Sequence, residues 1–89
     1  MKYAVWGTGV RGNLAVSFIG IDNIAVFIDE NRSKQHCVYM GKNVISFDEY
    51  VDGYSGCYIV ITPNDCDGII KKLNDQGIEH YSLLKDIIY

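Results

Sequence analysis

The sequence has little basic charge and no long apolar run. It carries 8 Lys+Arg against 11 Asp+Glu, a formal net charge of -3 over 89 residues. The basic residues are scattered, so we expect no positive face for a nucleic-acid backbone. No run approaches the roughly 18 apolar residues of a membrane span. The first apolar stretch meets a glycine at position 7, too early for a signal peptide. Neither nucleic acid nor a membrane is expected as a partner.

Paired cysteines and linker-like segments are also lacking. The three cysteines, Cys37, Cys57 and Cys66, are odd in number and form no C-x-x-C motif. This pattern argues against a disulfide framework and against a zinc site, so we expect no metal and a reducing, cytoplasmic location. There is no internal repeat and no Pro/Ser-rich linker. Since a chain of this length buries about two-thirds of its unfolded surface, residues 1–89 are expected to form one domain.

Short apolar runs predict three buried strands, at residues 3–6, 24–28 and 58–61. Between the first two, Val10, Leu14 and Phe18 recur every four residues, and Ala15 and Ile19 widen the stripe. This pattern predicts a helix over residues 10–19 with its apolar face on a sheet. Gly20 lies where that helix should end.

Residues that are typical of turns and helix ends predict the remaining elements. Residues 31–43 are mainly polar and read as a loop with a short extended piece at 37–40. Ser46 and Glu49 have the spacing of a capping box, which predicts a helix over 47–51. Thr62 as an N-cap and Pro63 at the first helical position predict a helix that ends at Gly77. A last strand over 78–82 and a helical turn or tail over 83–88 complete the chain.

Strands that alternate with helices predict an α/β fold with a mainly parallel sheet and helices on both faces. We expect a small Rossmann-like three-layer sandwich of about four strands, with the first strand central. The third strand, 58–61, is placed either beside the first or beyond the second. Ligands of such sheets bind outside the carboxyl ends of the strands, where the strand order reverses. Residues 7–12, 29–32 and 62–65 should meet there.

The first of these segments matches the G-x-G-x-x-G fingerprint of dinucleotide-binding folds. Gly7 allows the tight turn, Gly9 lets the backbone approach a pyrophosphate, and Gly12 lets the helix lie close to the strand. The amides that open the helix would face the anion. A tight turn without any ligand is the alternative. The candidate binding residues in this segment are Gly7, Thr8, Gly9, Val10, Arg11 and Gly12.

An acidic residue follows the second strand at the spacing that the fingerprint requires. Asp29 lies 22 positions after Gly7, close to the roughly 20 residues at which a carboxylate binds the ribose. Arg32 is placed to meet a 2′-phosphate, but Asp29 would repel one, so NAD is favoured over NADP. Asp29 is alternatively a cap or a solvated strand end, and Arg11 alternatively points into water. The further candidates are Glu30, Asn31 and Arg32, together with Thr62 and Asn64, which are read as caps first and ligand contacts second.

No catalytic residue is predicted. A hydride-transferring enzyme needs a substrate domain to hold the nicotinamide and a proton donor, and 89 residues leave no room for one. His36 and His80 pair with no carboxylate or cysteine at an informative spacing, so both are interpreted as structural or surface residues.

The order of these motifs resembles the small N-terminal domain of bacterial sugar O-acyltransferases and nucleotide-aminosugar N-acetyltransferases. The resemblance implies a Rossmann-like unit that binds a nucleotide sugar, with the glycine loop on the phosphates and the acidic strand end near the uridine. Residues 1–89 lack the left-handed β-helix of hexapeptide repeats, which carries the catalytic histidine and the acetyl-coenzyme A site in that family. Transferase activity is therefore not implied for these residues. The segments that carry the resemblance are residues 3–9, 26–31, 41–51 and 58–64.

These observations predict a nucleotide-binding module that performs no chemistry alone. The ligand is a uridine nucleotide sugar or NAD(P), and the module would serve a longer enzyme of lipopolysaccharide or capsule synthesis. One alternative is the NAD-binding domain of an oxidoreductase or of a cofactor sensor. A second is an interaction domain without a ligand, in which the segment Ile87-Ile88-Tyr89 buries surface on a missing catalytic domain or on a second copy of the chain.

Overall fold

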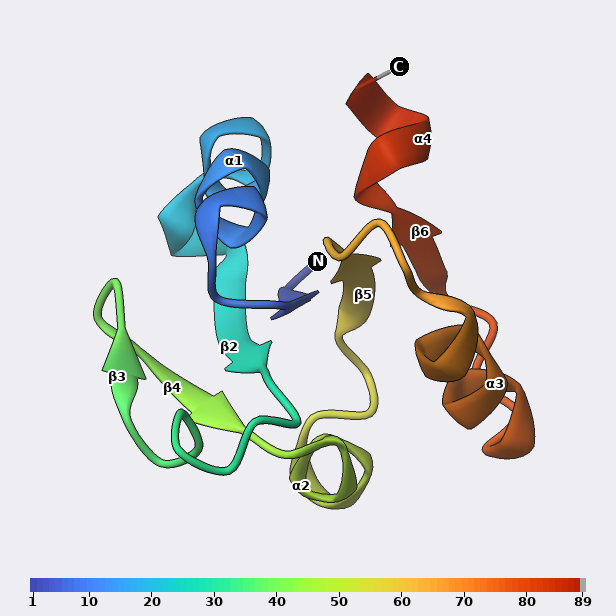
Figure 1. Ribbon diagram of the computed structural model, residues 1–89. Coiled ribbons are helices and arrows are strands. Elements are labelled where there is room, and N and C mark those ends of the chain that lie inside the picture. Colours follow the sequence, from blue (N-terminus) through green and yellow to red (C-terminus); the bar gives the residue numbers. More distant parts are fainter. Residues whose placement is uncertain (89) are drawn as a thin grey trace.

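Strands and helices alternate around one six-stranded sheet in a computed structural model, which describes residues 1–88 (Figure 1). Tyr89 lies outside the described residues. The strand order is β3-β4-β2-β1-β5-β6, and every pairing is parallel except the one between β3 and β4. The fold is therefore α/β, as predicted. The elements are β1 Tyr3–Trp6, α1 Val10–Ile19, a 3-10 turn Ile21–Asn23, β2 Ile24–Ile28, β3 Val38–Tyr39, β4 Lys42–Ile45, α2 Phe47–Gly53, β5 Tyr58–Ile61, α3 Asp67–Asp75, β6 Tyr81–Leu83 and α4 Leu84–Ile88.

The first strand lies in the middle of the sheet, as expected. From β1 the chain builds outward through β2 to β4 on one side, and then through β5 to β6 on the other. The sequence left open whether strand 58–61 lies beside the first strand or beyond the second. It lies beside the first, because β5 pairs directly with β1, with Tyr3 opposite Tyr58. Since β2 and β5 flank β1 in parallel, the carboxyl ends of all three strands lie at one edge of the sheet.

The expectation of about four strands was wrong. The short extended piece predicted at 37–40 forms strand β3, and the polar start of β4 concealed a further strand. Strand β4 begins with Lys42 and Asn43, and only Val44 and Ile45 are buried. These two residues pair with the end of β2, which leaves the polar half of β4 free to form a hairpin with the two-residue β3. An edge strand needs only a short apolar segment, so it gives a weak sequence signal.

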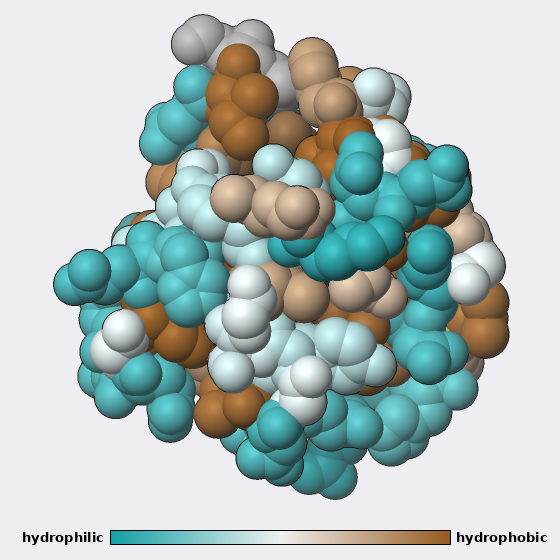
Figure 2. All heavy atoms as spheres, turned by 180° about the vertical axis from the view of Figure 1, so that it is seen from behind, coloured by the Kyte–Doolittle hydropathy of each residue, from teal (hydrophilic) through white to brown (hydrophobic). Residues whose placement is uncertain are grey.

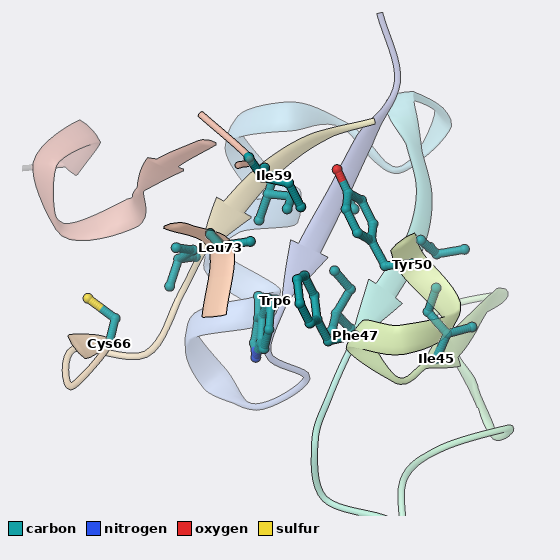
Figure 3. Packing of buried hydrophobic residues seen from close by; sticks show 12 residues of the cluster. Trp6, Ile45, Phe47, Tyr50, Ile59, Cys66 and Leu73 are labelled. Atoms are coloured by element: carbon teal, nitrogen blue, oxygen red, sulfur yellow. The ribbon is translucent and has the colours of Figure 1, made fainter. Parts of the chain in front are cut away.

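Two apolar clusters cover the two faces of the sheet. Along β1, Ala4 and Trp6 point into the cluster that α2 and α3 cover, while Val5 points into the cluster that includes Ala15 of α1 and Leu84 of α4. Figure 3 shows the larger cluster, with aromatic side chains from β1 and α2 lying side by side. Helices therefore contribute to the core on both faces.

Helix α1 has the predicted bounds, but only the Ala15 and Ile19 side of its predicted apolar stripe packs on the sheet. The line of Val10, Leu14 and Phe18 points outward, with exposed fractions of 86%, 37% and 58%. The buried residues of the helix are Gly12 and Ala15. Small side chains let the helix approach the strand closely, and this close approach determines the rotation of the helix more strongly than hydrophobicity does.

Helix α3 begins later than predicted. It starts at Asp67, and neither Thr62 nor Pro63 caps it. The Thr62 hydroxyl donates instead to the Trp6 carbonyl oxygen at 2.7 Å, which fixes the end of β5 against the end of β1. Residues 62–66 thus form a loop at the carboxyl edge of the sheet, which we call the β5–α3 loop.

Helix α2 confirms its predicted capping box. The Ser46 hydroxyl accepts a hydrogen bond from the Glu49 amide, and the Glu49 carboxylate accepts one from the Ser46 amide, both at 3.1 Å. Tyr50, one turn into the helix, is fully buried, and its hydroxyl donates to the Cys57 carbonyl oxygen at 2.7 Å. Burial raises the pKa of Tyr50 to about 12.

The face seen in Figure 2 is mainly hydrophilic, with apolar side chains in small separate groups. None of the helices within residues 1–88 is long and apolar enough to cross a membrane.

Candidate functional site

The three segments that the sequence assigned to one site do meet at the carboxyl edge of the sheet. The amide of Gly7 donates to the Ile28 carbonyl oxygen at 2.8 Å, and the Thr8 hydroxyl donates to the Asp29 carboxylate at 2.8 Å. On the other side, Arg11 Nε donates to the Thr62 carbonyl oxygen at 2.6 Å. The glycine loop, residues 7–12, therefore holds both the end of β2 and the β5–α3 loop.

The three glycines of this loop differ in what the fold requires of them. Gly7 has a φ of +115°, and a Cβ there would overlap the Thr62 hydroxyl. At Gly12 a Cβ would lie 2.5 Å from the Gly7 carbonyl oxygen. At Gly9 the φ is -88°, and a Cβ would meet nothing within 4 Å. The turn and the helix packing require Gly7 and Gly12, but no contact requires Gly9, where glycine is one of several residues that suit a helix N-cap.

The open space beside Gly9 lies at the amino-terminal end of α1. Gly9 is the N-cap residue, it makes no side-chain cap bond, and the first turn contains no acidic residue. The first amides of a helix have no intrahelical acceptor, and the helix dipole places partial positive charge there. This end of α1 therefore suits an anion.

Asp29 supports the glycine loop and keeps capacity for a ligand. One carboxylate oxygen accepts the Thr8 hydroxyl, and the other accepts the Asn31 amide at 2.9 Å. An ionised carboxylate has about four lone-pair directions, and these two hydrogen bonds use two of them.

The residues that follow Asp29 mainly hold the loop. The Glu30 carboxylate accepts the Phe47 amide at 2.8 Å and pairs with Lys72 at 3.2 Å, so it ties α2 and α3 to the end of β2. The Asn31 side chain accepts the Ser33 amide at 3.1 Å. Arg32 is exposed.

Arg11 does not point into water. Besides the bond to Thr62, its guanidinium nitrogen Nη2 is buried and has no hydrogen-bond partner within residues 1–88. A buried donor without an acceptor is unfavourable by about 1 to 3 kcal/mol, so this nitrogen is suited to an incoming anion. Asn64 is exposed in the β5–α3 loop, two positions after Thr62.

The sequence did not point to Tyr39, which the hairpin of β3 and β4 brings to the glycine loop. Its hydroxyl donates to the Gly9 carbonyl oxygen at 3.3 Å, and its ring packs edge-on against Phe27, with 4.8 Å between centroids. The local sequence carries no signal for this contact, because it depends on β4 pairing with β2. Between the hairpin and the glycine loop lies a cavity of 270 Å³, called here the hairpin cavity, lined by Thr8, Ser33, Lys34, Cys37, Val38, Tyr39 and Val44.

A larger cleft of 520 Å³ lies elsewhere, beside α2. It is lined by His36 and Glu49 among others, and no residue of the glycine loop borders it. No group of three His, Cys, Asp or Glu side chains within the described part of the chain is arranged to hold a metal ion. We therefore place the candidate site at the glycine loop, where separate segments converge.

His36 has a carboxylate partner that its spacing in the sequence did not reveal. Its Nε2 lies 3.0 Å from the Glu49 carboxylate, which links the loop after β2 to the capping box of α2. His80 contacts the Tyr50 hydroxyl and the Ser55 carbonyl oxygen. Both contacts agree with a structural role for the two histidines.

The capping box makes the free energy of unfolding depend on pH in the acidic range. The hydrogen bond from the Ser46 amide, with a smaller contribution from His36, lowers the pKa of Glu49 below its ordinary value of 4.5. Ionised Glu49 thus stabilises the fold above pH 4.5, and this contribution is lost as the pH falls through the lowered pKa. We expect Glu49→Gln to flatten the acid limb of the pH dependence, measured as urea midpoints between pH 3 and 7. Equal slopes in both proteins would contradict this role.

No protein-family model matches the chain, and no curated protein shows significant similarity to it. Functional assignment therefore depends on the residues and contacts described above.

Proposed function

We propose that the protein binds a nucleotide through its pyrophosphate at the glycine loop. The observation that carries this proposal is Gly9, where an added Cβ would meet no atom within 4 Å, so that no packing contact requires glycine. It keeps open the space in front of the amino-terminal end of α1, where a phosphate would accept hydrogen bonds from the first helical amides. Arg11, two residues after Gly9, supplies positive charge, and its buried Nη2 has no hydrogen-bond partner within residues 1–88.

The strand order supports a Rossmann-like unit. Without the short β3, the order is β4-β2-β1-β5-β6, which corresponds to the 3-2-1-4-5 order of dinucleotide-binding sheets. In such sheets the ligand lies outside the carboxyl end of the first strand, because the strand order reverses there. The glycine loop follows directly from that strand.

Between the two kinds of nucleotide, the contacts favour a nucleoside diphosphate such as a uridine nucleotide sugar. A dinucleotide would extend from β2 across β1 to β5, and this path passes the bond between Arg11 and the Thr62 carbonyl oxygen. The diphosphate of a uridine nucleotide sugar ends before that point, with its second phosphate near the guanidinium. Only one sugar ring extends beyond it, whereas NAD has a ribose and a nicotinamide there. NAD is the second candidate, supported by the position of Asp29 for binding ribose hydroxyls.

In this proposal the chain holds the ligand and contributes no catalytic residue. Its resemblance to the sugar acyltransferase domain suggests a recognition module of a bacterial enzyme that builds surface polysaccharide. A catalytic domain in the same longer enzyme would then act on the sugar, as a sugar-modifying transferase. With NAD as ligand, the parent enzyme would be an oxidoreductase.

The test measures unfolding temperature with UDP, UDP-N-acetylglucosamine, NAD, NADP and coenzyme A. A ligand at about 100 times its dissociation constant stabilises a fold by about 2.7 kcal/mol, which raises the midpoint of so small a domain by roughly 10 to 20 °C. We expect this shift with the uridine nucleotides.

Gly9→Val should abolish the shift, because its side chain would occupy the anion site. It should lower the unfolding temperature without ligand by no more than about 8 °C, since Gly9 has open surroundings and valine is less favourable than glycine at an N-cap by about 1 kcal/mol. Gly53→Val is the matched control: it is equally uncrowded, lies at the end of α2 and should keep the shift. The proposal fails if none of the five compounds shifts the midpoint, or if Gly9→Val binds as well as the original protein.

A further inference from the structure

The hairpin cavity lies against the glycine loop, and the proposed function does not yet assign it an occupant. Its walls come from three separate parts of the chain: Thr8 of the glycine loop, the β3–β4 hairpin, and the loop after β2, which contributes Ser33, Lys34 and Cys37. Its volume of 270 Å³ is just below the roughly 300 to 1,000 Å³ of whole small-molecule sites. It suits one ring system rather than a complete nucleotide.

One wall of the cavity is an aromatic ring that is held in place at two points. The Tyr39 ring packs edge-on against the fully buried Phe27, and its hydroxyl donates to the Gly9 carbonyl oxygen. Val38 and Val44 add apolar surface, while Ser33 and Lys34 supply polar groups. A fixed aromatic wall with apolar neighbours and a few polar groups is the composition that binds a planar heterocycle.

The cavity is also adjacent to the proposed phosphate and ribose positions. Thr8 borders the cavity and donates a hydrogen bond to Asp29. The phosphate position at Gly9, the ribose position at Asp29 and the cavity therefore lie around one residue, Thr8. We propose that the hairpin cavity is the nucleobase pocket of this protein, with Tyr39 as the residue that positions the base. This inference rests on the proposed nucleotide binding.

Cys37 provides a direct test, because its exposed thiol lines the cavity. Cys66 is buried, and burial raises the pKa of the Cys57 thiol, so an alkylating reagent at pH 7.5 should modify Cys37 first. Saturating UDP or NAD should then slow the alkylation of Cys37, measured by peptide mass spectrometry. With ligand at about 100 times its dissociation constant, the rate should fall by up to about 100-fold. Inorganic pyrophosphate, which has no base, should not protect it.

Variants of Tyr39 separate the ring from its hydroxyl. Since stacking on an aromatic residue contributes much of the affinity for a base, Tyr39→Ala should weaken nucleotide binding by about 5- to 150-fold. It should leave the affinity for inorganic pyrophosphate within about twofold, a change below 0.5 kcal/mol. Tyr39→Phe keeps the ring and should bind the nucleotide nearly as well as the original protein.

The outcomes distinguish this inference from the proposed function. If a nucleotide raises the unfolding temperature but neither protects Cys37 nor responds to Tyr39→Ala, the base lies elsewhere and the inference is overturned. If neither nucleotides nor pyrophosphate bind, the proposed function itself fails. Protection by nucleotide and not by pyrophosphate, together with selective weakening in Tyr39→Ala, supports both.

Discussion

Replacing Gly7 by alanine should unfold much of the protein or bring it close to unfolding. The residue has a φ of +115°, which side chains rarely adopt, and the added Cβ would overlap the Thr62 hydroxyl. That hydroxyl is itself fixed, because it donates to the Trp6 carbonyl oxygen. Backbone strain and overpacking together give an expected loss of about 2 to 6 kcal/mol in the free energy of unfolding. This is a large fraction of the roughly 5 to 15 kcal/mol of a typical domain.

Urea unfolding measures this loss, and Gly9→Ala is the matched control in the same loop. Gly9 has a φ of -88° and open surroundings, so the gain of alanine in the unfolded state is offset by the preference for glycine at an N-cap, and the free energy of unfolding should change by less than about 1 kcal/mol. An unchanged midpoint for Gly7→Ala would refute the turn geometry. Equal destabilisation by both substitutions would mean that the loop requires glycine throughout.

Truncating Phe47 to alanine should have the second large effect. Its ring lies between those of Trp6 and Tyr50 (Figure 3). The ring centroids of these two residues are 5.3 and 6.0 Å from that of Phe47. Phe47 is only 5% exposed, and removal of such a side chain from a core lowers the free energy of unfolding by about 3 to 5 kcal/mol. Trp6 is the only tryptophan of the chain, so its fluorescence reports directly on this cluster.

We expect the emission of Trp6 in folded Phe47→Ala to move to longer wavelength, and the urea midpoint to fall. Phe18→Ala is the matched control, because Phe18 is 58% exposed on α1 and surface substitutions usually change stability by less than about 0.5 kcal/mol. Comparable losses for the two variants would indicate that Phe18 is covered in solution.

Local sequence patterns predicted the elements whose signals are local. The apolar runs of β1, β2 and β5 and the capping box at Ser46 and Glu49 all appear where expected. The convergence of residues 7–12, 29–32 and 62–65 also followed from the parallel topology, and the contacts of Thr8 and Arg11 confirm it.

The misjudged features depend on contacts between distant residues. The rotation of α1 follows from Gly12 packing on the Gly7 carbonyl oxygen, so the apolar stripe through Leu14 was misleading. Thr62 has the residue type of a helix cap, yet its hydroxyl binds a strand 56 positions away. Tyr39 reaches the glycine loop only because β4 joins the sheet edge. Such partners are fixed by tertiary packing, which overrides local preference.

The central position of β1 has a consequence for synthesis of the chain on the ribosome. Its partner on one side, β5, is made much later, since Tyr3 pairs with Tyr58, 55 positions further along. At about 5 to 20 residues per second, roughly 3 to 11 s separate the two strands. During that interval the nascent chain can pair β1 only with β2, and the other edge of β1 stays open to strands from neighbouring chains. The incomplete nascent chain, rather than the finished sheet, is therefore the form most exposed to aggregation.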